Sequence, residues 1–198
     1  AGDAPTDPWP QAIMRLTLFA LIGSLCVHPL IPRVTGAQST DWTLDDQFGR
    51  PHNASEWKGR TVLLIAGASP AAATFAAWGD AIVAAYGRNP AAGADTLPFL
   101  VVGLADIGNA PRVLHPLIRL RLPRNRARPV LVDYRGTVSR SLGVERLTSN
   151  QMVLGPDGQV LLHTRGVPVD TAQARLIADA LRRSVELAAR PAVQRLAP

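Results

Sequence analysis

The chain has 198 residues, of which 47% are hydrophobic and 18% charged, a composition typical of one globular domain with terminal extensions. Its single cysteine, Cys26, excludes an internal disulfide and any cysteine-based zinc or iron–sulfur site. The four histidines show no ligand spacing, so we predict no metal site and no cofactor, and the net charge of +6 permits weak binding to anionic surfaces.

Residues 1–37 have the pattern of an N-terminal extension followed by a secretory signal peptide. Met14 and Arg15 precede an apolar run at 16–27, and the small residues Thr35-Gly36-Ala37 follow it. This run is shorter than the about 20 apolar residues that span a bilayer. We therefore predict export to a bacterial periplasm with cleavage after Ala37; the alternative is an N-terminal membrane anchor.

Residues 38–190 alternate apolar runs with turn signals and are predicted to form one domain, followed by a C-terminal tail at 191–198. The expected elements are a short strand and turn at 41–51, a helical turn at 55–60, a strand at 61–66, a helix at 70–86, a strand at 99–105, a helix at 111–122, a strand at 129–133, a short helix at 138–142, strands at 151–154 and 159–164, and a helix from 170 or 171 to about 190.

Local signals fix the type of several elements. The run at 61–66 is continuously apolar, as in a central strand that is covered on both faces, and Ser69 and Pro70 suit the N-cap and first turn of the helix that follows. Pro116 must start, kink or split the helix at 111–122. Asp157-Gly158 between two apolar runs predicts a hairpin.

The order of these elements, a parallel beginning and an antiparallel hairpin at the end, predicts a right-handed crossover between the two central strands. The expected architecture is α/β, a thioredoxin-like three-layer α/β/α sandwich with a mixed central sheet.

Over residues 41–187 the chain resembles the thioredoxin-like redoxin superfamily, which includes peroxiredoxins and TlpA-like thiol–disulfide proteins. The likeness is carried by an opening segment at 41–51 followed by Trp57-Lys58-Gly59-Arg60, by residues 130–144, and by the hairpin at 152–160. The turn Ile65-Ala66-Gly67 is also similar to that of the YtfJ-like periplasmic proteins, which lack a Cys-X-X-Cys pair.

The redox site that this resemblance implies is degenerate in the chain. The turn after the strand at 61–66 runs from Gly67 through Ser69 and Pro70 to Ala72, and Ser69 or a nearby alanine stands where a redoxin has its nucleophile. The proline that the family places before the hairpin strand aligns near Ser149. Because no cysteine follows Cys26, we predict no catalytic residue for thiol chemistry.

Arginines crowd into the seventeen residues from Arg112 to Arg128, which cover the helix at 111–122 and the segment after it. The candidates for an anionic docking patch are Arg119, Arg121, Arg124, Arg126 and Arg128. A docking patch for phosphate, lipid headgroups or an acidic partner and a plain solvated face both fit this pattern. No aromatic residue interleaves with the arginines, so nucleic acid is not expected as a partner.

The sequence thus predicts an exported, redox-inactive protein that acts as a binding or accessory module in the cell envelope, with an envelope protein as its partner. The alternative is an antioxidant or thiol–disulfide oxidoreductase, assigned by fold alone.

Overall fold

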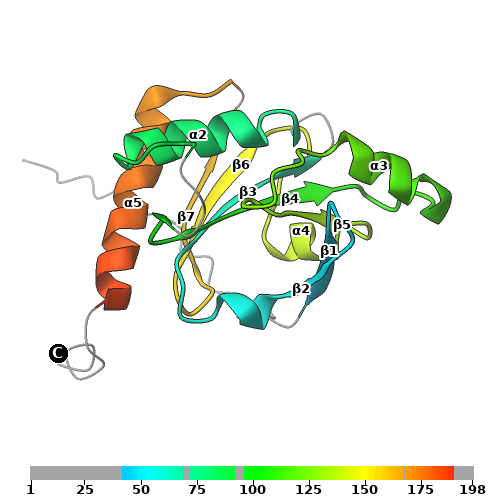
Figure 1. Cartoon of the computed structure of the whole chain (residues 1–198), viewed down its shortest axis with the longest axis horizontal. Helices are drawn as coiled ribbons and strands as arrows, with labels where there is room; N and C mark the ends of the chain where they lie inside the picture. Colours follow the sequence, from blue (N-terminus) through cyan, green and yellow to red (C-terminus); the bar gives the residue numbers. More distant parts are fainter. Residues whose placement is uncertain (1–41, 69–71, 92–95, 167, 190–198) are drawn as a thin grey trace, which may run out of the picture. The chain divides into compact units, whose positions relative to one another are not determined.

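The computed structural model describes residues 42–68, 72–91, 96–166 and 168–189. Within these ranges seven strands form one mixed sheet in the order β2-β1-β5-β4-β3-β6-β7 (Figure 1). The strands are β1 (Thr43–Asp46), β2 (Pro51–Asn53), β3 (Val62–Ala68), β4 (Leu100–Asp106), β5 (Val130–Asp133), β6 (Asn150–Leu154) and β7 (Val160–Arg165). The predicted signal peptide at 1–37 and the tail at 191–198 lie outside the described residues.

The position of the three central strands in the sheet explains why their sequences are apolar without alternation. β3, β4 and β5 run parallel, whereas β6 pairs antiparallel with β3 and β1 antiparallel with β5. Along β3, Leu63 and Ile65 belong to one buried cluster, and Val62, Leu64 and Ala66 belong to the cluster on the opposite face. Both faces are therefore covered, as expected for parallel strands.

Helices cover the two faces and make the predicted three-layer α/β/α arrangement (Figure 1). On one face lie α2 (Phe75–Ala85) and α5 (Thr171–Ala189), whose Trp78, Ile82, Ile177 and Leu181 are fully buried. On the other face lie the short helix α4 (Thr137–Ser141) and the 3-10 turn η1 (Ala54–Trp57). None of the helices in the described part of the chain is long and apolar enough to cross a membrane.

The helix predicted at 111–122, which Pro116 was expected to start, kink or split, forms two pieces. A 3-10 turn, η3 (Arg112–Leu114), leads into α3 (His115–Arg121), where Pro116 occupies the first turn. Proline lacks the N–H that a helix interior needs but fits its first turn, so the new helix begins there.

The start of the helix predicted at 70–86 falls partly outside the described residues. Ala72 is helical, and α2 spans Phe75–Ala85 with Thr74 at its N-cap position, so the predicted N-cap at Ser69 stays a prediction. Ser69 and Pro70 themselves lie outside the described residues. Gly67 is not in a turn but inside β3, because the strand continues to Ala68, and Gly67 pairs in register with Ala105.

Candidate functional site

The candidate site lies where the parallel strands end. At this edge Asp106 of β4 lies in register with Ala68 of β3 on one side and with Asp133 of β5 on the other. The loop at 145–149 contacts the end of β3, because the Ala68 N–H donates to the carbonyl oxygen of Arg146 at 3.1 Å. In open α/β sheets, ligands bind outside the carboxyl ends of the strands, where this loop lies.

Asn150, the first residue of β6, holds this loop through its buried amide. Its Nδ2 lies 2.8 Å from the carbonyl oxygen of Glu145, 3.1 Å from that of Thr148 and 3.2 Å from that of Ala66. Its Oδ1 accepts from the backbone N–H of Glu145 at 3.0 Å. One side chain thus fixes both ends of the loop and attaches it to β3.

His163 of β7 completes this hub, with its Nε2 at 3.1 Å from the Asn150 Oδ1. Burial lowers the pKa of His163 below its usual value, and the positive charge of Arg165 lowers it further. The neutral imidazole is therefore favoured, and the tautomer with a proton on Nε2 donates to Asn150.

Ser149, the position of the predicted degenerate proline, is fully buried. Its Oγ accepts from the Gln151 Nε2 at 2.9 Å, and the Gln151 Oε1 accepts in turn from Thr164 and Gln173. Its hydroxyl therefore belongs to a closed network of neutral groups between β6, β7 and α5. None of these partners is an acid or base that activates a nucleophile, so Ser149 is structural.

Two buried carboxylates, Asp106 and Asp133, stand at the ends of β4 and β5. Asp133 accepts from the backbone N–H groups of Thr137 and Ser139 and so caps α4. Asp106 forms an ion pair with Arg146, with the Nε to Oδ2 distance at 3.1 Å, while its Oδ1 has no hydrogen-bond partner among the described residues. This ion pair orients Arg146, whose side chain is half exposed.

Leu147 is the most exposed large apolar side chain that the structure describes, at 92%. It sits next to Arg146, in a loop whose backbone Asn150 holds from both ends. A fixed loop that presents one apolar and one cationic side chain is suited to binding. Within the described ranges, no group of three or more His, Cys, Asp or Glu could hold a metal ion.

The other predicted site residues are not gathered here. Ala72 is buried in the core cluster of α2 and α5. Arg119 pairs with Asp45 at 2.8 Å, and Arg128 pairs with Asp80 and donates to the carbonyl oxygen of Pro90. The remaining three of the predicted patch, Arg121, Arg124 and Arg126, are exposed.

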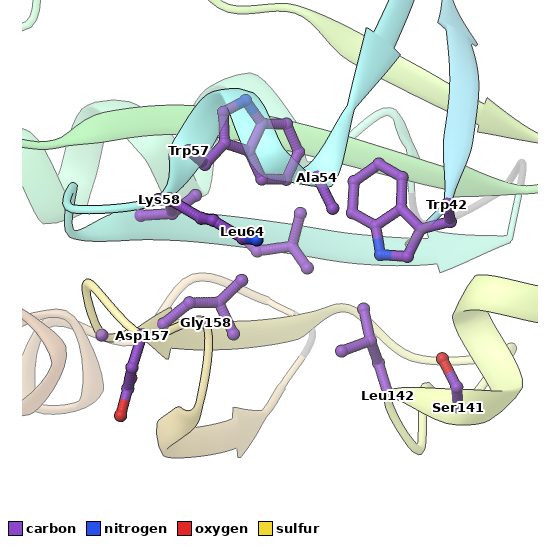
Figure 2. A pocket seen from close by; sticks show the side chains of 12 residues that line it. Trp42, Ala54, Trp57, Lys58, Leu64, Ser141, Leu142, Asp157 and Gly158 are labelled. Carbon is purple, nitrogen blue, oxygen red and sulfur yellow. The ribbon is translucent and has the colours of Figure 1, made fainter. Parts of the chain in front are cut away.

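Besides an open hollow of about 400 Å³ lined by Thr43, Asp133 and Tyr134, two further cavities lie on the domain. One is lined by Trp42, Trp57 and Leu142 (Figure 2) and measures about 50 Å³, far below the about 300 Å³ of a small-molecule site. In it the two tryptophan rings pack edge to face at 5.1 Å. The other, about 530 Å³, lies between α2 and the β4–β5 part of the sheet, and its charged residues Asp80 and Arg128 neutralise each other.

Solved structures with a similar fold are known. A DsbE-type thiol:disulfide interchange protein from Chlorobium tepidum has a TM-score of 0.53 and 20% identity, with 76% of this chain and 96% of that chain covered. A mutant of peroxiredoxin Q from Xanthomonas campestris has a TM-score of 0.53 and 16% identity, over 76% and 95% of the two chains. The chain has the thioredoxin-like fold of the redoxins.

A third structure, the pneumococcal exposed lipoprotein thioredoxin from Streptococcus pneumoniae, has a TM-score of 0.50 and 20% identity, over 74% of this chain and 98% of that one. No family model matches the sequence, and no curated protein matches it either. Identities this low show the fold and not the activity. The narrower likeness to the YtfJ-like proteins stays a prediction.

Sequence reasoning found Ser149 but missed Asn150, His163 and Asp106. Asp106 had a usable signal, because a carboxylate directly after an apolar strand falls at the binding edge of a parallel sheet. Asn150 had none, since its link to Ala66 joins residues that are far apart in sequence.

Proposed function

We propose that the chain is a redoxin-fold binding module of the bacterial cell envelope, without thiol chemistry of its own. The proposal depends on the conformation of the loop at 145–149, which lies where a redoxin has its proline. In this chain buried amides hold the loop, and it presents Leu147 and Arg146 to the outside.

The rigidity of the loop favours binding. A loop that is already ordered loses little conformational entropy when a partner docks, so an exposed leucine on it contributes more to affinity than one on a mobile segment. The chemistry presented is one apolar anchor beside one guanidinium. A fitting partner is an envelope protein segment that offers an apolar pocket next to a carboxylate.

An envelope location is supported by the signal pattern at 1–37 and by the likeness to an exposed lipoprotein thioredoxin. The alternative function, thiol–disulfide exchange or peroxide reduction, is what the names of the similar structures describe for those proteins. That chemistry requires a thiolate, and Cys26 within the predicted signal is the only sulfhydryl in the sequence.

Site-specific crosslinking tests this proposal. A photoreactive amino acid is placed at Leu147 in the native host, and a matched control chain carries it at Leu161 of β7, a leucine that is 47% exposed. We expect a discrete crosslinked envelope protein from position 147 alone, which is lost when Arg146→Ala is added. Identical products from both positions, or none from position 147, would contradict the proposal.

A further inference from the structure

The helix α3 turns its apolar side chains outward. Leu117 and Leu120, three residues apart on one face of the helix, are 58% and 64% exposed, and Val113 of the preceding turn η3 is 79% exposed. None of them lines any of the cavities described above. In a soluble helix such a face is normally the one that packs on the core.

Polar and aromatic contacts hold α3 on the domain instead. The His115 ring stacks on Tyr134 with the ring centres 3.5 Å apart, and Arg119 pairs with Asp45 at 2.8 Å while its guanidinium lies 5.8 Å from the Tyr134 ring centre. These contacts hold the inner side of the helix against Tyr134 and Asp45, so Leu117 and Leu120 lie on its exposed side.

Arginines without a carboxylate partner surround this apolar face. Arg112 and Arg121 lie on η3 and α3 themselves, and neither forms an ion pair with any residue that the structure describes. Arg124 and Arg126 follow α3, with their guanidinium groups 5.2 and 5.8 Å from the ring centre of Phe48. Gly49, the neighbour of Phe48, lies close to the guanidinium of Arg119 on α3.

We infer that η3, α3 and the following loop dock on the surface of an anionic lipid bilayer. Leucines at helical spacing enter the boundary between headgroups and acyl chains, and flanking guanidiniums bind lipid phosphates. The unpaired positive charge matches an anionic headgroup layer, and each arginine near such a surface strengthens binding roughly fivefold. This inference does not depend on the proposed partner of the Leu147 loop.

A local probe separates this docking from any contact of the N-terminal apolar run. In full-length Cys26→Ser protein, Leu117→Cys carries an environment-sensitive dye, and the control carries it at Leu176→Cys of α5, which is similarly exposed at 50%. α5 lies at the other end of the domain from α3 (Figure 1). We expect a blue shift at position 117 on vesicles of phosphatidylethanolamine and phosphatidylglycerol (3:1), none on phosphatidylcholine, and none at position 176.

Two matched charge variants locate the binding surface. Changing Arg112, Arg121, Arg124 and Arg126 to Gln lowers the net charge as much as changing the exposed Arg60, Arg88, Arg175 and Arg183 to Gln. The first set should raise the lipid concentration needed for half of the shift tenfold or more, while the second should raise it far less. An equal effect of both sets, no shift on anionic vesicles, or a shift with soluble polyglutamate but not with lipid would overturn the inference.

Discussion

Asn150 and Ala66 are joined by a hydrogen bond of 3.2 Å from the Asn150 Nδ2 to the Ala66 carbonyl oxygen, which ties the start of β6 to the neighbouring strand β3. A redoxin is expected to shape this region with a proline, whose ring restricts its backbone. Here a buried amide does so with hydrogen bonds, and the surface loop keeps a defined backbone without the proline.

Asn150→Ala should therefore destabilise the domain strongly. The substitution leaves the buried Ala66 carbonyl oxygen and the part-buried Glu145 N–H and Thr148 carbonyl oxygen without their side-chain partner, and an unsatisfied buried group costs about 1–3 kcal/mol. We expect a loss of about 3 kcal/mol in the free energy of unfolding, measured by urea denaturation. Asn89→Ala, which removes one exposed turn contact, is the control and should change it little.

Mild acid should weaken the same hub through His163. Because burial and Arg165 lower the pKa of this residue in the folded protein, the unfolded chain binds its proton more readily. The stabilisation is present above the unfolded pKa of about 6.5 and is lost as the pH falls below it. His163→Gln keeps a donor without titrating, so its stability should vary less between pH 7.5 and 5.5. Parallel pH profiles of the two proteins would count against this role.

Asp46 should affect stability in a more acidic window. Burial raises the pKa of its carboxyl, but hydrogen bonds from the backbone N–H groups of Arg50 and Phe48 and the contact with His52 outweigh burial and lower it. The stabilisation is thus present above the unfolded pKa of about 3.9 and lost as the pH falls through the folded value. Asp46→Asn should cost about 1.5 kcal/mol at pH 7 in thermal unfolding. The gap to wild type should close as the pH falls through the folded pKa.

A double-mutant cycle tests how α5 docks on the sheet. The hydroxyls of Thr61 and Ser184 are buried and 2.7 Å apart, and they connect the start of β3 to α5. Thr61→Val or Ser184→Ala alone leaves one hydroxyl without its partner and should cost about 1–2 kcal/mol, whereas the double variant should be nearly as stable as either single one. Strictly additive losses would show that the two side chains do not interact.

The sequence was sufficient to predict the elements that are determined by their own residues. β3 and β4 are apolar without alternation, and the Asp157-Gly158 turn fixes a hairpin, so strand type and order followed directly. β2 was not predicted, because Pro51-His52-Asn53 has no strand preference of its own. It forms by pairing with β1 and through the contact of His52 with Asp46.

The outward face of α3 could not be predicted for a related reason. Its leucines have the spacing of a buried stripe, yet His115 and Arg119 face the domain because Tyr134 and Asp45 are there to meet them. Those partners lie on other elements of the fold. In the same way, the sequence marked the position of Ser149 but not the amide network that closes around it.

Thiol-dependent turnover tests the central claim, a redoxin fold without redox chemistry, most directly. Full-length wild type and Cys26→Ser are assayed for insulin reduction with dithiothreitol and for thiol-dependent peroxide consumption. Ser69→Cys with Ala72→Cys in the Cys26→Ser background serves as the positive control, because it restores a Cys-X-X-Cys pair. We expect rates at the buffer blank for wild type and Cys26→Ser, and a measurable rate for the restored pair. Turnover by Cys26→Ser that persists after repurification would contradict it.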